Sequence, residues 1–173
     1  MADIYKTIFL TAPWGIALID SITAQILEAN PAYCKIVGRT VEELKTMHWI
    51  DFTHLDDVQR GLGNIADMNI GKTARFSAQE RYIQSDGTVV HVDTIVVPVK
   101  VVSKPCHICM IQDVSVRVIM EEKLAILARE TLLINENLQN INKVLEASNI
   151  RLKHLYPWAE QVISLCSEGD KLK

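Results

Sequence analysis

The longest regular pattern in the chain is a row of mostly apolar residues between Asp113 and Leu155. Steps of three and four residues alternate along it, with heptad position a at Leu124, Thr131, Leu138, Leu145 and Leu152 and position d at Leu127, Ile134, Ile141, Ser148 and Leu155. No glycine or proline interrupts the segment, so we predict a helix of about 40 residues, roughly 60 Å long. We call this row the heptad seam.

A single helix of that length has no core of its own to cover the seam. We therefore expect self-association and an output role, with packing of the helix back on its own domain as the alternative. In ideal coiled coils, Leu at a with Ile at d favours assemblies of more than two helices. Two polar seam residues, Thr131 and Ser148, and the flanking residues Asn135, Asn142 and Asn149 weaken this seam. We therefore predict a homodimer. The residues assigned to the interface are Ile4, Ile8, Leu124, Leu127, Ile134, Leu138, Ile141, Leu145, Leu152 and Leu155.

The first part of the chain predicts an amphipathic helix, two strands and several short helices. Asn30-Pro31 is typical of a helix start, and Thr40 with Glu43 has the spacing of a capping box. The predicted elements are a helix at 2–12, strands at 15–20 and 25–29, and helices at 32–37, from 40, and from 53 to about 68.

The pattern then changes to strands at 76–84, 89–101 and 106–112. Ser85-Asp86-Gly87-Thr88 is a hairpin turn, because Asp-Gly readily adopts the left-handed conformations that a tight turn needs. The order of elements predicts an α+β domain with one antiparallel sheet and helices over one face, followed by the long helix.

Composition narrows the classes of partner. The chain has 173 residues and a net charge of −3 without a basic block, which disfavours nucleic acid as a partner. The start of the chain does not have the pattern of a signal peptide, and no apolar run approaches the ~20 residues of a membrane span.

The cysteines are few and unevenly spaced: Cys34, Cys106, Cys109 and Cys166. We therefore expect free thiols in a reducing cytoplasm.

An ordered set of short motifs resembles the PAS domain family over roughly residues 5–117. Two departures, Ile22-Thr23-Ala24-Gln25 in the first hairpin and Leu55 in place of the usual proline, have the character of loop variations. The motifs are Gly15-Ile16-Ala17-Leu18-Ile19-Asp20, Ile26-Leu27-Glu28-Ala29-Asn30-Pro31-Ala32-Tyr33, Gly38, Glu42-Glu43-Leu44, Thr53-His54-Leu55-Asp56-Asp57, Ser85-Asp86-Gly87-Thr88 and Asp113-Val114-Ser115.

The resemblance implies a sensory module: a five-stranded sheet with a pocket on one face, a flanking N-terminal helix that dimerises, and a C-terminal coiled coil that passes the signal on. Applied to this sequence, the arrangement of the family implies a flanking helix at 1–12, a PAS domain at 13–115, a signalling helix at 116–156, and a short helix and tail at 157–173. Asp113, at the exit, is expected to anchor the sheet to the helix by hydrogen bonding. The output is a downstream protein or an effector domain outside this sequence.

The pocket candidates are polar or aromatic residues among apolar strands: Tyr33, Trp49, Phe52, Phe76, Tyr82, His91 and Thr94. Strand alternation places His91 and Asp93 on one face and Val92 and Thr94 on the other, but it does not say which face is inside. A filled core that binds no ligand, in a pure assembly module, is the alternative.

The sequence lacks the usual marks of an enzyme. It has no glycine-rich phosphate loop and no Gly-x-Ser-x-Gly. His154 stands three residues before Pro157, which is not the phosphoacceptor spacing of histidine kinases. We therefore expect a protein without catalytic residues.

Metal and most cofactors are also disfavoured. Cys106 and Cys109 point to opposite faces of a strand, and no second pair of ligands follows. The resemblance to PAS domains implies that a haem-ligating histidine would lie within 58–72 and a light-reactive cysteine within 45–57, and neither segment contains that residue. The cofactor is therefore unknown: a non-covalent flavin in a redox sensor, stacked on Trp49, or a small metabolite remains open.

Overall fold

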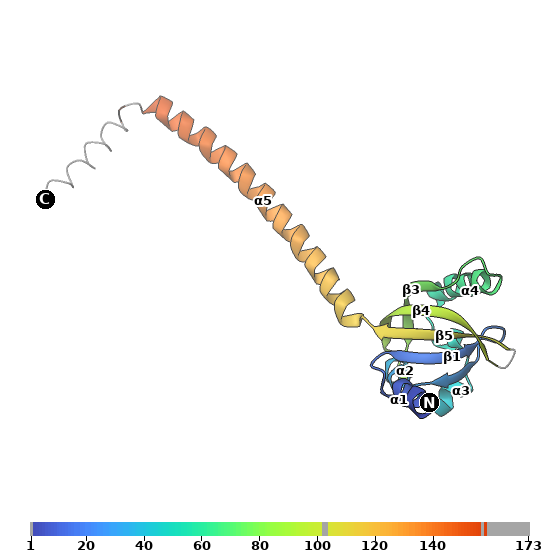
Figure 1. Cartoon of the computed structure of the whole chain (residues 1–173). Helices are drawn as coiled ribbons and strands as arrows, with labels where there is room; N and C mark the ends of the chain where they lie inside the picture. The colour runs from blue at the N-terminus through green and yellow to red at the C-terminus, as the bar shows by residue number, and fades with distance from the viewer. Residues whose placement is uncertain (1, 102–103, 157, 159–173) are drawn as a thin grey trace. The chain divides into compact units, whose positions relative to one another are not determined.

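The computed structural model describes residues 2–101, 104–156 and 158, and the chain divides into two compact units (Figure 1). The first unit extends to Met120 and contains the sheet and the short helices. The second begins at Glu121 and contains most of the long helix.

The first unit is built on a five-stranded antiparallel sheet. Its strand order is β2-β1-β5-β4-β3, so β1 lies between β2 at the edge and the last strand, β5. This confirms the predicted α+β class. The strands are β1 (Gly15–Asp20), β2 (Ile26–Ala29), β3 (Phe76–Ile83), β4 (Val89–Val101) and β5 (Lys104–Asp113).

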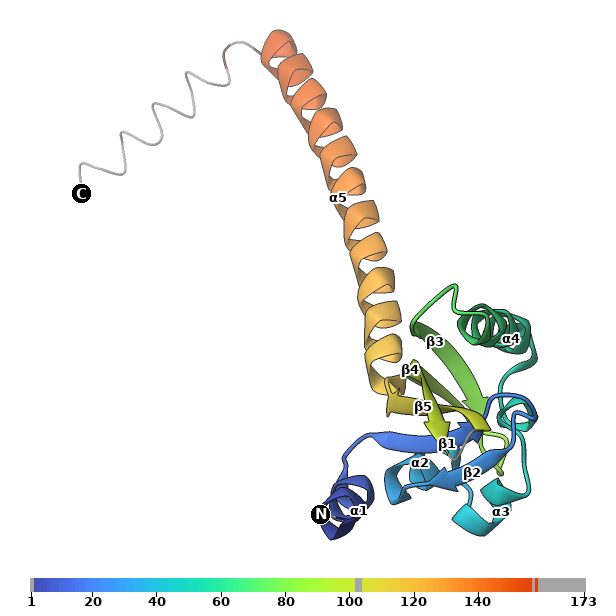
Figure 2. The same ribbon diagram turned by 45° about the vertical axis from the view of Figure 1, so that its right-hand side comes forward.

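Short helices pack against the sheet, with α2 on β1, α3 on β2 and α4 on β3 (Figure 2). Two of them have the ends that the sequence predicts. Asn30 caps α2 by accepting a hydrogen bond from the backbone N–H of Tyr33, and Gly38 ends it with φ +68°. Thr40 and Glu43 form the capping box of α3. The helices are α1 (Ala2–Thr11), α2 (Pro31–Val37), α3 (Val41–Lys45), the 3₁₀ turn η1 (Trp49–Asp51) and α4 (Leu55–Asn69).

The first hairpin turns without the Asp-Gly pair. The Asp20 carboxylate accepts hydrogen bonds from the backbone N–H groups of Ile22 (2.8 Å) and Thr23 (2.9 Å). Ala24 adopts φ +66°, a conformation that glycine more often takes. A side chain and one strained residue thus replace the usual turn residues.

The Asn30 side chain is the polar centre of the first unit and is fully buried. Its Oδ1 accepts from the N–H of Ile16 (2.8 Å) and of Tyr33 (2.8 Å), and its Nδ2 donates to the carbonyls of Phe9 (3.0 Å) and Trp14 (2.9 Å). Because every hydrogen-bonding position is satisfied, this amide joins the end of α1 to β1 and α2.

The hydrophobic core lies between the inner face of the sheet and the helices. Strand alternation places Val90, Val92, Thr94 and Val96 of β4 inside, while His91 and Asp93 lie on the other face. The buried aliphatic and aromatic side chains include Ile19, Ile26, Tyr33, Val37, Leu44, Trp49, Phe52, Met68, Tyr82 and Ile111.

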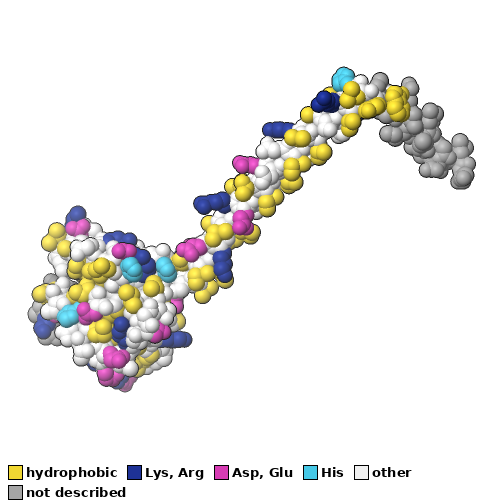
Figure 3. All heavy atoms as spheres, turned by 180° about the vertical axis from the view of Figure 1, so that it is seen from behind, with side chains coloured by type: hydrophobic (Ala, Val, Ile, Leu, Met, Phe, Trp, Pro, Cys, Tyr) yellow, Lys and Arg dark blue, Asp and Glu magenta, His cyan; other side chains and the backbone are white. Residues whose placement is uncertain are grey.

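The long helix α5 runs from Ser115 to Leu155 and has 41 residues, as predicted. None of its residues is buried, and apolar side chains follow it along its length (Figure 3). The apolar seam residues are 51–65% exposed: Leu124, Leu127, Ile134, Leu138, Ile141, Leu145, Leu152 and Leu155. The helix predicted at 157–173 lies outside the described residues, apart from Trp158.

Candidate functional site

The core of the first unit contains a small cavity of about 20 Å³. A cavity of this size has room for about one or two water molecules. Its lining comes from the first and last strands, from β3 and β4, from η1 and from α4. The lining residues are Ile19, Trp49, Gly61, Ile65, Phe76, Glu80, Tyr82, Val96, His107 and Cys109.

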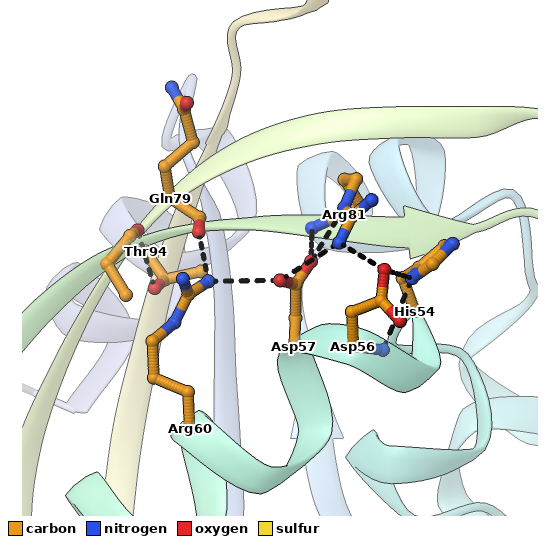
Figure 4. A network of polar contacts seen from close by, with 8 residues as sticks. His54, Asp56, Asp57, Arg60, Gln79, Arg81 and Thr94 are labelled. Atoms are coloured by element: carbon orange, nitrogen blue, oxygen red, sulfur yellow. Dashed lines mark hydrogen bonds and ion pairs between the residues drawn. The ribbon is translucent and has the colours of Figure 1, made fainter.

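A polar network holds α4, one wall of the cavity, against β3 (Figure 4). Asp57 accepts from the backbone N–H of Arg81 (3.0 Å) and from its Nε (2.9 Å), and a second oxygen accepts from Arg60 Nη2 (3.2 Å). Arg60 also donates to the carbonyl of Gln79 (2.6 Å), and Arg81 pairs with Asp56 (3.2 Å). Burial raises the pKa of Asp57, but hydrogen bonds from Arg81 and the charges of Arg81 and Arg60 outweigh it, so the pKa lies below its usual value.

Trp49 of η1 lines the cavity next to α4. Thr53 Oγ1 donates to the Trp49 carbonyl (2.8 Å), which fixes the 3₁₀ turn. A Cβ on Gly61 would lie 2.7 Å from the Trp49 ring, so this close approach requires glycine. The Trp49 indole N–H is buried and has no hydrogen-bond partner.

Glu80 is a buried carboxylate on the inner face of β3. Its side chain is 5% exposed, and Phe76 and Tyr82 point to the same face of the strand. Burial raises the pKa of Glu80 to about 7; the charge of Arg60 and a hydrogen bond with Tyr82 oppose the rise, and the charge of Asp57 adds to it. At neutral pH this group is therefore divided between the neutral and the charged form.

His107 and Cys109 reach the cavity from β5. His107 Nδ1 lies 3.0 Å from Ser21 Oγ. Burial lowers the pKa of His107 to about 4, against the charge of Asp20, so the ring is neutral at pH 7. Burial raises the pKa of the Cys109 thiol to about 12, with a further contribution from Glu80, so this sulfur is protonated and not nucleophilic.

The structure brings only part of the predicted pocket together. Trp49, Phe76 and Tyr82 line the cavity. Three further candidates are buried in the core without lining it. These are Tyr33, whose hydroxyl has no partner, Phe52, edge-on to Tyr82 with ring centroids 5.2 Å apart, and Thr94, which donates to the Ala78 carbonyl (2.9 Å).

The assignment of His91 to the pocket is corrected. His91 is on the face of β4 opposite to Val92 and Thr94, and these two residues are buried in the core. Alternation separated the two faces correctly, but only the packed helices decide which face is inside.

Sequence reasoning missed the polar groups that give the cavity its character. Glu80 occupies an apolar phase of β3, two residues from Tyr82, and this break in alternation is a signal that the sequence contains. The position of His107 between Cys106 and Cys109 in a predicted strand does not indicate which face of the sheet it occupies. Gly61 has no sequence signal, because its role depends on a contact with Trp49 from another element.

The exit from the sheet into α5 is fixed by three interactions within the first unit. Asp113 Oδ1 accepts from the N–H of Ser115 (2.9 Å) and caps the helix. Ser115 Oγ accepts from the N–H of His91 (3.0 Å), and Arg117 Nη2 pairs with Asp93 (2.6 Å). The start of α5 is thus bonded to β4 as well as to the end of β5.

Residues 2–101, 104–156 and 158 contain no group of three or more His, Cys, Asp or Glu side chains that could hold a metal ion. Within the same residues, no helix has the length and apolarity needed to cross a membrane.

Comparison with known proteins identifies the fold. Residues 26–111 match the family model described as PAS fold. No curated protein matches the chain. Three similar solved structures are a PAS domain of a Desulfitobacterium hafniense protein (25% identity, TM-score 0.54, 62% of this chain and 98% of that one), a PAS domain of an HTR-like protein from Haloarcula marismortui (17%, 0.56, 65% and 90%), and a sensory box histidine kinase/response regulator from Burkholderia thailandensis (19%, 0.57, 74% and 96%).

Proposed function

The chain contains a PAS domain, and from this premise we propose that it is a sensory module that binds a small molecule in its core and signals through a dimer of α5. PAS domains are typical of sensory signalling proteins. The finer function, which is ligand binding and dimeric output, is the proposal. A downstream protein or an effector domain outside this sequence would receive the signal.

One observation carries the ligand-binding part: the core contains a cavity lined by Trp49, whose buried indole N–H has no hydrogen-bond partner. The Trp49 indole N–H is buried and unpartnered, and Glu80 beside it is a buried carboxylate. A buried polar group without a hydrogen bond destabilises the fold, typically by about 1–3 kcal/mol. A ligand that satisfies these groups would bind and stabilise the domain.

The output part is supported by the exit and by the exposed seam. Asp113, Ser115 and Arg117 bond the start of α5 to the sheet, so a movement of β4 or β5 changes contacts of the helix. The seam beyond it exposes eight Leu and Ile side chains, which a second copy would cover. Ligand binding would then shift the population of α5 arrangements in a homodimer.

The titratable groups of the cavity and the free cysteines bear on enzymatic activity and on the cellular compartment. The titratable polar groups at the cavity include the Glu80 carboxylate, the neutral His107 imidazole and the protonated Cys109 thiol, and they do not form a nucleophile–base pair. We therefore propose a protein without enzymatic activity. Three cysteines, Cys34, Cys106 and Cys109, are free thiols, which supports a reducing compartment such as the cytoplasm.

A ligand-free assembly module is the second candidate, and the small size of the cavity favours it. Pockets for drug-sized ligands are roughly 300–1,000 Å³, whereas this cavity is about 20 Å³. The same comparison disfavours a flavin and its use as a redox sensor. The unpartnered Trp49 N–H distinguishes the site from an ordinary filled core and keeps the sensory proposal first.

Native mass spectrometry of the purified chain tests both parts together. We expect a dimer that carries a bound small molecule. The matched variants are Gly61→Ala, whose Cβ would meet the Trp49 ring, and Gly63→Ala on the same helix, whose Cβ would meet nothing within 4 Å. The first should lose the bound mass and the second should keep it. A monomer would contradict the output part, and a dimer without bound mass in every sample would favour the assembly module.

A further inference from the structure

The cavity lining combines three aromatic rings with one carboxylate. Trp49, Phe76 and Tyr82 come from η1 and β3, and Glu80 lies between the last two on the same strand face. Glu80 is the single acidic residue in this lining. Aromatic rings around a site attract cations through the negative face of each ring, and a carboxylate adds a full opposite charge.

Glu80 has no ion-pair partner among the described residues. The nearby cation is Arg60, but its guanidinium bonds to Asp57 and to the carbonyl of Gln79. An unpaired carboxylate in a buried site is costly, and it is relieved either by a proton or by a cation from outside the chain. A cation that can also contact aromatic rings is the better fit to this lining.

We propose that the cavity binds a small compound through a protonated amine, with Glu80 as counterion and the rings of Trp49, Phe76 and Tyr82 around the ammonium group. This inference rests on the proposed ligand-binding function and names the chemical class of the ligand. The ammonium group donates to the Glu80 carboxylate, and no covalent bond forms or breaks.

Size and the remaining donor narrow the class further. The cavity of about 20 Å³ admits an ammonium group or a methylammonium group, but no bulky ring. The unpartnered indole N–H of Trp49 needs an acceptor, which a hydroxyl or carbonyl oxygen next to the amine would supply. The smallest aliphatic amines match the volume of the cavity, whereas an amino alcohol, with at least four heavy atoms, exceeds it.

The charge state of Glu80 gives the proposal a distinctive pH dependence. An ammonium ion binds the ionised carboxylate, whose pKa in the free protein is about 7. The ionised fraction therefore rises about tenfold between pH 6 and pH 8, and the affinity should rise by the same factor. The titratable and charged groups around Glu80 are Asp57 and Arg60 of α4, Tyr33 of α2, Tyr82 of β3, and His107 and Cys109 of β5.

A nuclear magnetic resonance titration of the full chain tests the proposal directly. The Trp49 indole N–H signal, assigned by its loss in Trp49→Phe, reports on the cavity. Methylammonium chloride should shift this signal saturably, and dissolved ethane, a neutral molecule of nearly the same size that has no acceptor for the Trp49 N–H, should not. The methylammonium affinity should increase about tenfold from pH 6 to pH 8.

The matched variants are Glu80→Gln and Glu28→Gln, the second on an exposed position of β2. Glu80→Gln should weaken methylammonium binding at pH 8 at least tenfold and remove its pH dependence, whereas Glu28→Gln should bind as the parent does. If Glu80→Gln does not fold, the comparison of methylammonium with ethane in the parent protein decides the question.

Three results would overturn the amine proposal: equal response to methylammonium and ethane, unchanged affinity in Glu80→Gln, or no response to methylammonium. The broader function is decided separately by the bound mass and its loss in Gly61→Ala, which do not depend on charge. A neutral compound found there would preserve ligand binding and exclude an amine.

Discussion

The two regions of the molecule use apolar side chains in opposite ways. In the PAS domain, Leu44 and Ile111 are 0% and 1% exposed, within a core that the domain itself closes. On α5, Leu124 and Leu138 are 65% and 51% exposed, and no residue of the helix is buried. The same residue types therefore stabilise the fold of one region and remain available for association in the other.

This difference indicates where stability and association should be found. Removing an apolar side chain from the domain loses contacts that exist within one chain. Removing one from α5 changes little in a single chain, because helices owe most of their stability to packing of the apolar face. Variants in the two regions should therefore separate folding from dimerisation.

The largest expected effect is that of Phe52→Ala in the core. Phe52 is fully buried, edge-on to Tyr82, with the Arg39 guanidinium 5.6 Å from its ring centroid. We expect the free energy of unfolding of the domain to fall by about 3–5 kcal/mol, measured by urea denaturation. Leu133→Ala, on α5 but outside the seam, should lower it by less than about 0.5 kcal/mol. An equal loss in both would mean that α5 is packed against the core.

The pH dependence of stability should change in Glu80→Gln. Because burial raises the pKa of Glu80 from 4.5 to about 7, the unfolded chain loses a proton that the folded chain keeps between these values. Stability from this group is present below pH 4.5 and is lost as pH rises to 7, in total about 3 kcal/mol.

The lowered pKa of His107 changes the stability with pH in the opposite direction, so removing the Glu80 contribution in Glu80→Gln makes the His107 contribution visible. Its pKa falls from 6.5 to about 4, so stability is lost as pH falls through this range. The two slopes oppose each other between pH 4.5 and 6.5 in the parent. Glu80→Gln should leave a stability that rises over this interval, while Glu136→Gln, on exposed α5, should reproduce the parent curve in urea unfolding. If the stability of Glu80→Gln depended on pH in the same way as that of the parent, the raised pKa of Glu80 would be contradicted.

The seam is tested by Leu138→Asp and Leu133→Asp, two identical changes on one helix. Leu138 is at position a of the seam, whereas Leu133 is outside it and similarly exposed. We expect Leu138→Asp to raise the dimer dissociation constant at least about hundredfold in sedimentation experiments. The reason is that the two protomers would each place a negative charge at the same level of the seam. Leu133→Asp should change it less than about threefold. Equal effects would place the interface elsewhere on α5.

The smallest expected effect is at the exit, where Asp113→Ala removes the cap on Ser115. The loss should be about 1 kcal/mol, seen as faster hydrogen exchange in the first turn of α5. Asp113→Asn keeps an acceptor oxygen and should exchange as the parent does. If the exit transmits the signal, Asp113→Ala should also remove the ligand response of α5. A full response in this variant would mean that Ser115 and Arg117 suffice for coupling.

Much of the fold was predictable because its signals are local. The caps at Asn30 and Thr40, the Asp86-Gly87 turn and the heptad seam each depend on residues a few positions apart. The cavity depends on residues from six elements, and no local pattern reports how these meet. Three aromatic candidates were found because large rings belong in cores, whereas Glu80 and Gly61 matter only through contacts across the core.

The fully bonded amide of Asn30 has a consequence for the chemical ageing of the protein. Asparagine usually converts to aspartate when the next backbone nitrogen attacks its side chain and forms a cyclic imide. Here the next residue is Pro31, whose nitrogen has no hydrogen to lose, so that route is closed. Conversion would have replaced the amide donor to the carbonyls of Phe9 and Trp14 by an oxygen. The residue that starts α2 thus also protects the attachment of α1 during the lifetime of the protein.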